Sequence, residues 1–248
     1  MVDTITLPND LYSIMLGYIN LDDARYIVTK DMDDSEKCNY AAKNGYLELL
    51  KHFHENGCPW YEETCNFAAE NGHLKCLTYL HENGCQWDEE TCHVAAYNGN
   101  IECLKYLHVN KCVWNEHVCH SAIINGQLEC LKYMNDNGCV FGEWICADAA
   151  VNGQLECLKY VHEEKGFMWD KWACYRTVQN GHLDCLKYLL ENGSNLDKSI
   201  CNFAAEFGHL DCLKYLHENG CPWDNETCYL AAMNGHIECL EYIQDNYC

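Results

Sequence analysis

Cysteine recurs through this chain at a spacing that constrains its fold more than any other feature. The chain has 248 residues, of which 21 are cysteine. One series is spaced by 27 residues apart from a single gap of 28, and comprises Cys38, Cys65, Cys92, Cys119, Cys146, Cys174, Cys201 and Cys228. A fixed period of this length indicates an array of stacked structural repeats. We therefore predict eight repeats over residues 38–248, starting near these cysteines, preceded by an N-terminal cap at residues 1–37.

Residues 87–109 show what one repeat is expected to build. Asp88 is a good N-cap, and the two carboxylates that follow it lie where the helix dipole favours negative charge. Asn98 and Gly99 offer a left-handed end to this first helix. A second helix is expected from Ile101 to about Val109, where apolar residues recur at helical spacing. Such short helices are marginal alone in water, so we predict an all-α array in which each pair stacks on its neighbours.

Alanine pairs and a second-helix phrase recur in most repeats. The pairs include Ala68-Ala69 and Ala95-Ala96, and the phrase is found at residues 71–80 and 180–189. Both resemble the two helices of the ankyrin-repeat family. The period of 27 residues is shorter than the ankyrin period of about 33, and the missing part falls where ankyrins form a β-hairpin. The resemblance implies an ankyrin-like solenoid of stacked helix-turn-helix repeats lacking long β-hairpin fingers, in which the helices carry recognition.

Composition excludes several classes of partner. The 16 Lys and Arg residues against 38 Asp and Glu leave a formal charge of −22, which repels a phosphate backbone, so we expect no nucleic-acid partner. The first ten residues lack the features of a signal peptide, and no apolar run approaches the roughly 20 residues of a membrane span. We expect an intracellular protein with no membrane contact. Shortened Cys- and Trp-rich arrays resemble those of large DNA viruses and some protists, so the expected location is cytoplasmic, in the host if the source is viral.

Catalytic motifs are missing from the sequence. It contains no P-loop, no Gly-x-Ser-x-Gly and no His-Glu-x-x-His, so we expect neither an enzyme nor a cofactor. No Cys-x-x-Cys occurs either, which argues against serial zinc sites. A local metal site formed by His93, His117 and His120 stays open as a third function, because two of these histidines lie three apart on one expected helix.

The remaining cysteines form two further series. The second, in the expected second helices, comprises Cys76, Cys103, Cys130, Cys157, Cys185, Cys212 and Cys239. The third, after an Asn-Gly-like turn, comprises Cys58, Cys85, Cys112, Cys139, Cys221 and Cys248, with Ser194 in its place in the sixth repeat. We expect all 21 to be thiols, mostly buried as small apolar side chains. Stacked helices lie too far apart for disulfides between equivalent cysteines, whereas contacts between different series stay open.

Tryptophan is also periodic. Trp60, Trp87, Trp114, Trp169 and Trp223, with Phe141 at the same position, each lie beside an expected N-cap. Recurrence in nearly every repeat favours a packing role over a ligand cage, since packing is needed in every repeat and a cage is not. Trp144 and Trp172 differ, because they occupy a position that holds Glu or Ser in most other repeats.

Comparison of the repeats with one another separates framework from variable positions. Counted from the first-series cysteine, positions −2, +1 and +5 vary most and share one helix face, which we call the variable face. We predict that this face binds a protein partner, and its candidate residues are His93, Tyr97, His117, His120, Ile124, Trp144, Val151, Trp172, Tyr175 and Gln179. Contiguous exposed aromatic side chains are typical of protein contacts. The alternative is that these side chains pack against neighbouring helices.

The N-terminal stretch from Leu7 to Val28, LPNDLYSIMLGYINLDDARYIV, resembles the opening of an F-box. The resemblance rests on the Leu-Pro start and two expected amphipathic helices, and it implies a substrate adaptor that binds the linker protein of a cullin ubiquitin ligase. The stretch is shorter than a full F-box, and a solenoid also needs a cap on its first repeat. We therefore expect protein–protein recognition as the leading function and ligase adaptation as the alternative.

Overall fold

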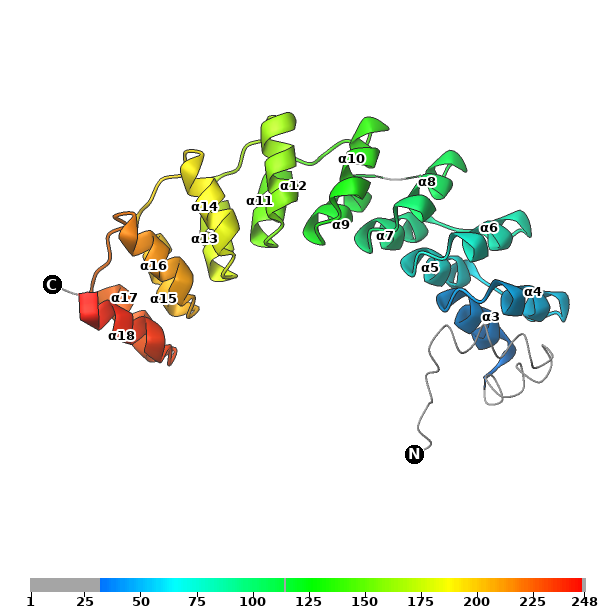
Figure 1. Ribbon diagram of the computed structural model, residues 1–248, viewed down its shortest axis with the longest axis horizontal. Helices are drawn as coiled ribbons and strands as arrows, with labels where there is room; N and C mark the ends of the chain where they lie inside the picture. Colours follow the sequence, from blue (N-terminus) through cyan, green and yellow to red (C-terminus); the bar gives the residue numbers. More distant parts are fainter. Residues whose placement is uncertain (1–31, 114, 247–248) are drawn as a thin grey trace. The chain divides into compact units, whose positions relative to one another are not determined.

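The fold is a succession of short helices joined by turns (Figure 1). The computed structural model describes residues 32–113 and 115–246, and these ranges contain no β-strand. They confirm the predicted all-α architecture of stacked helix pairs without β-hairpin fingers. The chain divides into two compact bodies between Val113 and Trp114. Residues 7–28 and Trp114 lie outside the described residues, so the F-box-like segment stays a prediction.

The described part of the first body, residues 32–113, contains three helix pairs. Within each pair the two helices pack together, and first helices stack on first helices while second helices stack on second helices. The elements are α3 (Asp34–Lys43), α4 (Leu47–Glu55), α5 (Glu62–Glu70), α6 (Leu74–Glu82), α7 (Glu89–Tyr97) and α8 (Ile101–Val109). The last two match the helices expected from residues 87–109.

In the second body, residues 115–246 form five helix pairs that stack in the same manner. The elements are α9 (Glu116–Ile124), α10 (Leu128–Asp136), α11 (Ile145–Val151), α12 (Leu155–Lys159), η1 (Tyr160–Glu164), α13 (Lys171–Gln179), α14 (Leu183–Glu191), α15 (Lys198–Glu206), α16 (Leu210–Glu218), α17 (Asn225–Met233) and α18 (Ile237–Asn246). The element η1 is a π-helical turn that continues α12. It lies in the repeat whose period is 28 rather than 27 residues, so the added residue is absorbed as a wider helical turn.

Side-chain caps define where most first helices begin. The Asp88 carboxylate accepts a hydrogen bond from the Glu90 amide at 3.0 Å, and Asn115, Asp170, Asp197 and Asp224 cap their helices in the same way. The first helices end at a turn whose glycine is left-handed, as at Gly99 with φ 75°. These are the start and stop signals that the sequence predicts.

In most helix pairs, one polar side chain at the start of the second helix bonds to the preceding pair. His73 Nε2 lies 3.1 Å from the carbonyl oxygen of Lys43, at the end of α3 in the preceding pair. Its ring lies so close to Gly45 that a Cβ there would come within 2.6 Å of His73 Nδ1, so only glycine fits. The same kind of bond is made by Asn100, Gln154, His209 and His236. These bonds satisfy carbonyl groups that a helix end leaves without an intrahelical donor.

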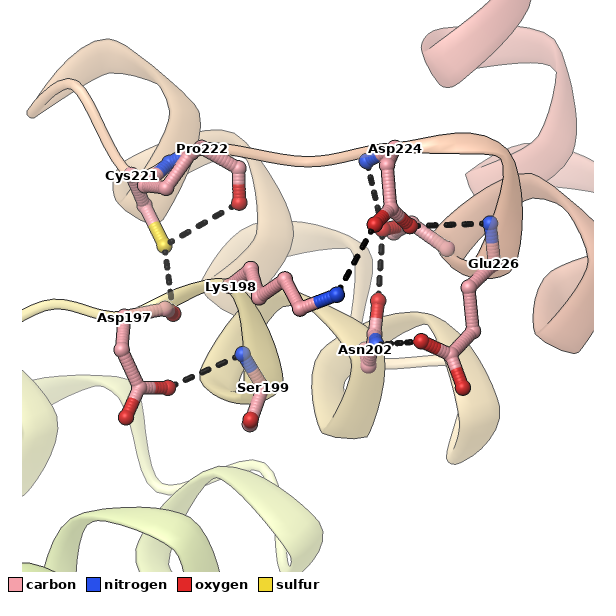
Figure 2. A network of polar contacts seen from close by, with 9 residues as sticks. Asp197, Lys198, Ser199, Asn202, Cys221, Pro222, Asp224 and Glu226 are labelled. Atoms are coloured by element: carbon pink, nitrogen blue, oxygen red, sulfur yellow. Dashed lines mark hydrogen bonds and ion pairs between the residues drawn. The ribbon is translucent and has the colours of Figure 1, made fainter.

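A threonine–asparagine bond links some of the stacked first helices. The Thr64 hydroxyl donates to Asn39 Oδ1 at 2.6 Å and accepts from the Tyr61 amide at 3.2 Å. Thr91 donates to Asn66, and Thr227 donates to Asn202, which is labelled in Figure 2. Each threonine directly precedes a first-series cysteine and each asparagine directly follows one. Each of these buried hydroxyls therefore has a hydrogen-bond partner, and we call the three bonds the Thr–Asn ladder.

The core is rich in sulfur. The first-series cysteines are buried, except for the half-buried Cys228, as the core interpretation predicts. The expectation that all cysteines are thiols is wrong at one place, because Cys119 and Cys139 form a disulfide. This bond joins the first series to the third, which is the kind of contact that helix spacing leaves open. The other described cysteines are thiols.

The recurring tryptophans among the described residues lie in ring clusters between helix pairs. Trp87 stacks on His81 with ring centroids 3.9 Å apart, and His81 Nδ1 lies 3.0 Å from the hydroxyl of Tyr106 in the next pair. Equivalent clusters surround Trp60, Trp169 and Trp223. This arrangement supports the packing interpretation of the periodic tryptophans and separates them from Trp144 and Trp172.

Candidate functional site

Trp144 lies just before a helix that begins late. The position that holds the cap Asp88, Asn115 or Asp170 in other repeats is Gly142, which has no side chain to cap the helix. As a result α11 starts at Ile145, and Trp144 lies in the preceding turn with 56% of its surface exposed. Trp172 is exposed to the same extent on the first turn of α13. Exposed tryptophans on adjacent helices of the second body form an apolar surface that water does not favour.

A hollow of about 530 Å³ lies between these tryptophans. Its lining comes from α11, α13 and their N-caps, and comprises Trp144, Ala147, Asp148, Val151, Asp170, Trp172, Ala173 and Arg176. The two alanines occupy the positions where the Thr–Asn ladder places Asn and Thr in other repeats. Because alanine fills neither position, space remains between the two helices. We call this space the tryptophan hollow.

The rim of the tryptophan hollow is polar and of mixed charge. Asp170 caps α13 by accepting from the Ala173 amide at 3.0 Å, so its carboxylate is held in place. Lys171 Nζ lies 5.6 Å from the centroid of the Trp172 ring, at the distance of a cation–π contact. Arg176 is exposed at the same rim. An apolar centre with a polar rim is the composition of many protein-binding surfaces.

A second hollow of about 350 Å³ lies on the other side of Trp144. It is lined by His117, His120, Gly142, Trp144, Ile145 and Asp148. His120 Nδ1 lies 2.9 Å from Asp148 Oδ2, which links α9 to α11. Trp144 therefore borders both hollows, and four of the predicted residues, His117, His120, Val151 and Trp172, lie around it.

Aromatic side chains continue from Trp172 along the next helix. Tyr175 packs edge-on against Trp172 with centroids 5.5 Å apart, and on its other side lies 5.4 Å from Phe203 of α15. The Tyr175 hydroxyl donates a short hydrogen bond to Asp197. This hydrogen bond is the main cause, and burial the second, that raises the pKa of Tyr175 to about 12. The same bond lowers the pKa of Asp197. Tyr175 is thus fixed in orientation rather than free to turn.

Other predicted residues lie apart from the hollows. His93 and Tyr97 belong to α7 of the first body, where their rings stack with centroids 6.2 Å apart. Ile124 and Gln179 are half-buried at the ends of α9 and α13, and their main-chain carbonyls accept from Gln154 and His209. Their part in binding stays a prediction.

Sequence reasoning missed the residues two positions after the first-series cysteine. Asp148, Arg176 and Phe203 hold this position and lie in or beside the site. The signal was present, because the same position holds Phe67, Val94 and Ser121 in other repeats and so varies as widely as the three positions that were chosen.

Metal binding has no support within the described residues. Across residues 32–113 and 115–246, no three His, Cys, Asp or Glu side chains are grouped as ligands of a metal ion would be. His93 Nδ1 lies 3.5 Å from Glu90, and His120 contacts Asp148, so carboxylates rather than other imidazoles approach these rings. None of the helices described has the length and apolarity to cross a membrane.

The comparison with protein families agrees with the repeated architecture. The family described as "Ankyrin repeats (3 copies)" matches residues 38–112, 66–143, 92–171 and 171–248. Together these matches cover all eight first-series cysteines. No curated protein matches the chain.

Proposed function

Because the chain belongs to the ankyrin-repeat family, whose members are in general protein–protein interaction modules, we propose that it binds a protein partner through the variable face of its first helices. The contact centres on the tryptophan hollow of the second body. Binding rather than catalysis is proposed, in keeping with the family.

A single observation carries this proposal: Trp144 and Trp172 are each 56% exposed on either side of a hollow of about 530 Å³. The periodic tryptophans among the described residues are packed into ring clusters, whereas Trp144 and Trp172 are exposed. Tryptophan is enriched among residues that dominate the binding energy of protein interfaces. Large apolar side chains exposed together mark contact surfaces.

The shape and chemistry of the hollow indicate what the partner inserts. An aliphatic or aromatic side chain fits between the two indole rings, above Ala147 and Val151. Asp148, Asp170 and Arg176 at the rim then bond to polar groups flanking that side chain. Exposed rim charges of this kind contribute more to orientation and association rate than to affinity.

A cytoplasmic location belongs to the same proposal. An oxidising compartment converts many cysteines into disulfides, whereas all the described cysteines except Cys119 and Cys139 are thiols. The alternative role as a ligase adaptor would add a second partner at residues 7–28.

The test is capture of partners with the full-length chain and with the double variant Trp144→Ala/Trp172→Ala, followed by mass spectrometry. Each truncation is expected to cost about 2 kcal/mol or more of binding energy, because hot-spot aromatic residues contribute this much. Proteins lost with the double variant are then purified, and their affinities for both forms are measured by calorimetry. Recovery of a cullin-ligase component that depends on residues 7–28 would support the adaptor role.

Two matched controls make the result specific. Val140→Ala removes another exposed apolar side chain, 77% exposed and outside the variable face, and is expected to keep every partner. Trp169→Ala removes a packed tryptophan from its cluster with His162 and Tyr188, and is expected to lower the melting temperature. If the double variant lost stability like Trp169→Ala and kept its partners, Trp144 and Trp172 would be packing residues and the proposal would fail.

A further inference from the structure

Sulfur atoms of the first and third cysteine series meet in pairs within single helix pairs. Cys65 Sγ on α5 lies 3.2 Å from Cys85 Sγ, which follows α6, at a separation of 20 residues. Cys92 with Cys112, and Cys201 with Cys221, repeat this separation, and their side chains are hydrogen-bonded to one another. The same pairing brings Cys119 and Cys139 into a disulfide, with Cα atoms 7.0 Å apart. The pairing is therefore a repeated property of the fold.

We propose that the thiol pairs Cys65–Cys85, Cys92–Cys112 and Cys201–Cys221 are sites of reversible disulfide formation, with a small hydroperoxide such as hydrogen peroxide as the oxidant. The separation of 20 residues found at Cys119 and Cys139 recurs at each pair, together with a hydrogen bond between the two side chains. Because the two side chains of each pair already touch, an oxidant that reaches one of them finds its bonding partner beside it. This inference is independent of the proposed partner.

Access to the sulfur atoms selects a small oxidant. The helix cysteines Cys65 and Cys92 are 0% exposed, whereas the turn cysteines Cys85 and Cys112 are 2% and 6% exposed. Cys85 also lines a surface hollow of about 470 Å³, together with Trp60, Tyr61, Glu62, Glu63, Gly84 and Gln86. Hydrogen peroxide is small enough to reach the turn sulfur from this hollow.

Hydrogen bonding identifies the attacking sulfur. Cys65 donates to Cys85, and this bond lowers the pKa of Cys85 while it raises the pKa of Cys65. The pKa of Cys112 and that of Cys221 are lowered in the same way by Cys92 and Cys201. Since the thiolate is the reactive form, the turn cysteine of each pair reacts first.

The reaction balances in two steps. The Cys85 thiolate attacks one oxygen of hydrogen peroxide, the O–O bond breaks, and the products are a sulfenic acid on Cys85 and hydroxide, which takes up a proton to become water. The Cys65 sulfur then attacks the Cys85 sulfur, a second water leaves with the Cys65 proton, and the S–S bond forms. Two thiols lose two electrons and two protons, and one peroxide becomes two waters. A dithiol reductant reverses the oxidation by exchange.

The chain contains its own unpaired controls. In the sixth repeat Ser194 replaces the turn cysteine and bonds to Cys174, so no bridge can form there. The fifth repeat has no third-series cysteine, and its Cys146 thiol donates instead to the carbonyl of Phe167 at 3.3 Å. A hollow of about 230 Å³ reaches Cys174 and Ser194 from the surface, so hydrogen peroxide can approach Cys174 as it approaches Cys85.

Oxidation would tie the turn after each second helix to the first helix of the same pair. In Figure 2 the Cys221 thiol lies against the backbone carbonyl of Asp197, the cap of α15. A bridge from Cys221 to Cys201 closes a chain segment that spans the whole pair. Closing such segments reduces the entropy of the unfolded chain, so the oxidised protein is expected to melt at a higher temperature than the reduced one.

The experiment uses the full-length protein, reduced with dithiothreitol and freed of reductant. It is exposed to hydrogen peroxide, denatured in N-ethylmaleimide, digested, and mapped by mass spectrometry. The expected products are linked peptides at a separation of 20 residues, from Cys65–Cys85, Cys92–Cys112, Cys201–Cys221 and the reference pair Cys119–Cys139. Cys146 and Cys174 are expected as maleimide adducts, and dithiothreitol should restore all the thiols.

The variant Cys85→Ser gives the matched test, because it copies the arrangement of Cys174 with Ser194. It is expected to lose the link to Cys65 alone, to leave Cys65 as a maleimide adduct, and to keep the other links. Links scattered among all three series, oxidation of Cys146 and Cys174 to the same extent as the pairs, or no links beyond Cys119–Cys139 would each overturn the proposal.

Discussion

Helices α3 and α5 of the first body hold together differently from α11 and α13 of the second. Between α3 and α5 the Thr64 hydroxyl bonds to Asn39, so both side chains are committed to the framework. The same two positions in α11 and α13 are Ala147 and Ala173, and these line the tryptophan hollow. The same two positions can therefore either bond neighbouring helices together or leave a hollow at the surface. Between α11 and α13, where the polar bond is absent, a hollow opens.

Breaking the ladder should have the largest effect on stability. Thr91→Val leaves Asn66 Oδ1 without its donor, and the expected loss is about 1 to 3 kcal/mol in the free energy of unfolding, the usual cost of an unsatisfied polar group. Urea unfolding of the full chain measures it. The double variant Asn66→Ala/Thr91→Val should lose less than the sum of the two single variants, because the two side chains act together. Additive losses would show that the ladder is not a unit.

Adding a Thr–Asn bond between α11 and α13 should have the opposite and smaller effect. Ala147→Asn with Ala173→Thr is expected to add about 1 kcal/mol of stability, the net value of a protein hydrogen bond. Because both new side chains project into the tryptophan hollow, partner capture should fall while Trp144 and Trp172 remain. Ala147→Asn alone lacks the donor and serves as the control. Equal stability of the single and double variants would show that the new Asn and Thr side chains do not bond to each other.

The smallest effect concerns the histidines that bond across helix pairs in both bodies. Burial lowers the pKa of His73 and of His182 from the ordinary value of 6.5. A histidine whose pKa is lower in the folded protein takes up protons on unfolding. The stability of the folded protein is therefore fully present above about pH 6.5 and falls as the pH drops below that value. Thermal melting between pH 7.5 and 5.5 should show this decline.

The variant His73→Asn makes the pH effect specific, since Asn100 fills the equivalent position of the next pair and bonds to Ala69 and Glu70. It should retain the fold and reduce the decline. A decline of unchanged size in His73→Asn and in His182→Asn would assign it to other groups.

Much of the fold was predictable because its signals are local. The cap Asp88, the left-handed Gly99 and the apolar spacing from Ile101 each act within one helix, so the period and the helix pairs could be read from neighbouring residues. The candidate site was predictable only in part. Trp144 and Trp172 stood out by their position in the repeat, whereas Asp148 and Arg176 did not.

Helix caps and a periodic apolar pattern recur in most repeats and act over short distances along the chain. The repeat, the helix boundaries, the burial of the cysteine series and the family can therefore be recognised from the sequence. Tertiary structure alone decided which side chains meet across helix pairs. It placed Thr64 against Asn39, joined Cys119 to Cys139 and opened a hollow above Ala147 and Ala173. These contacts join residues 20 or more positions apart, so they depend on how the turn returns and how closely the helices stack.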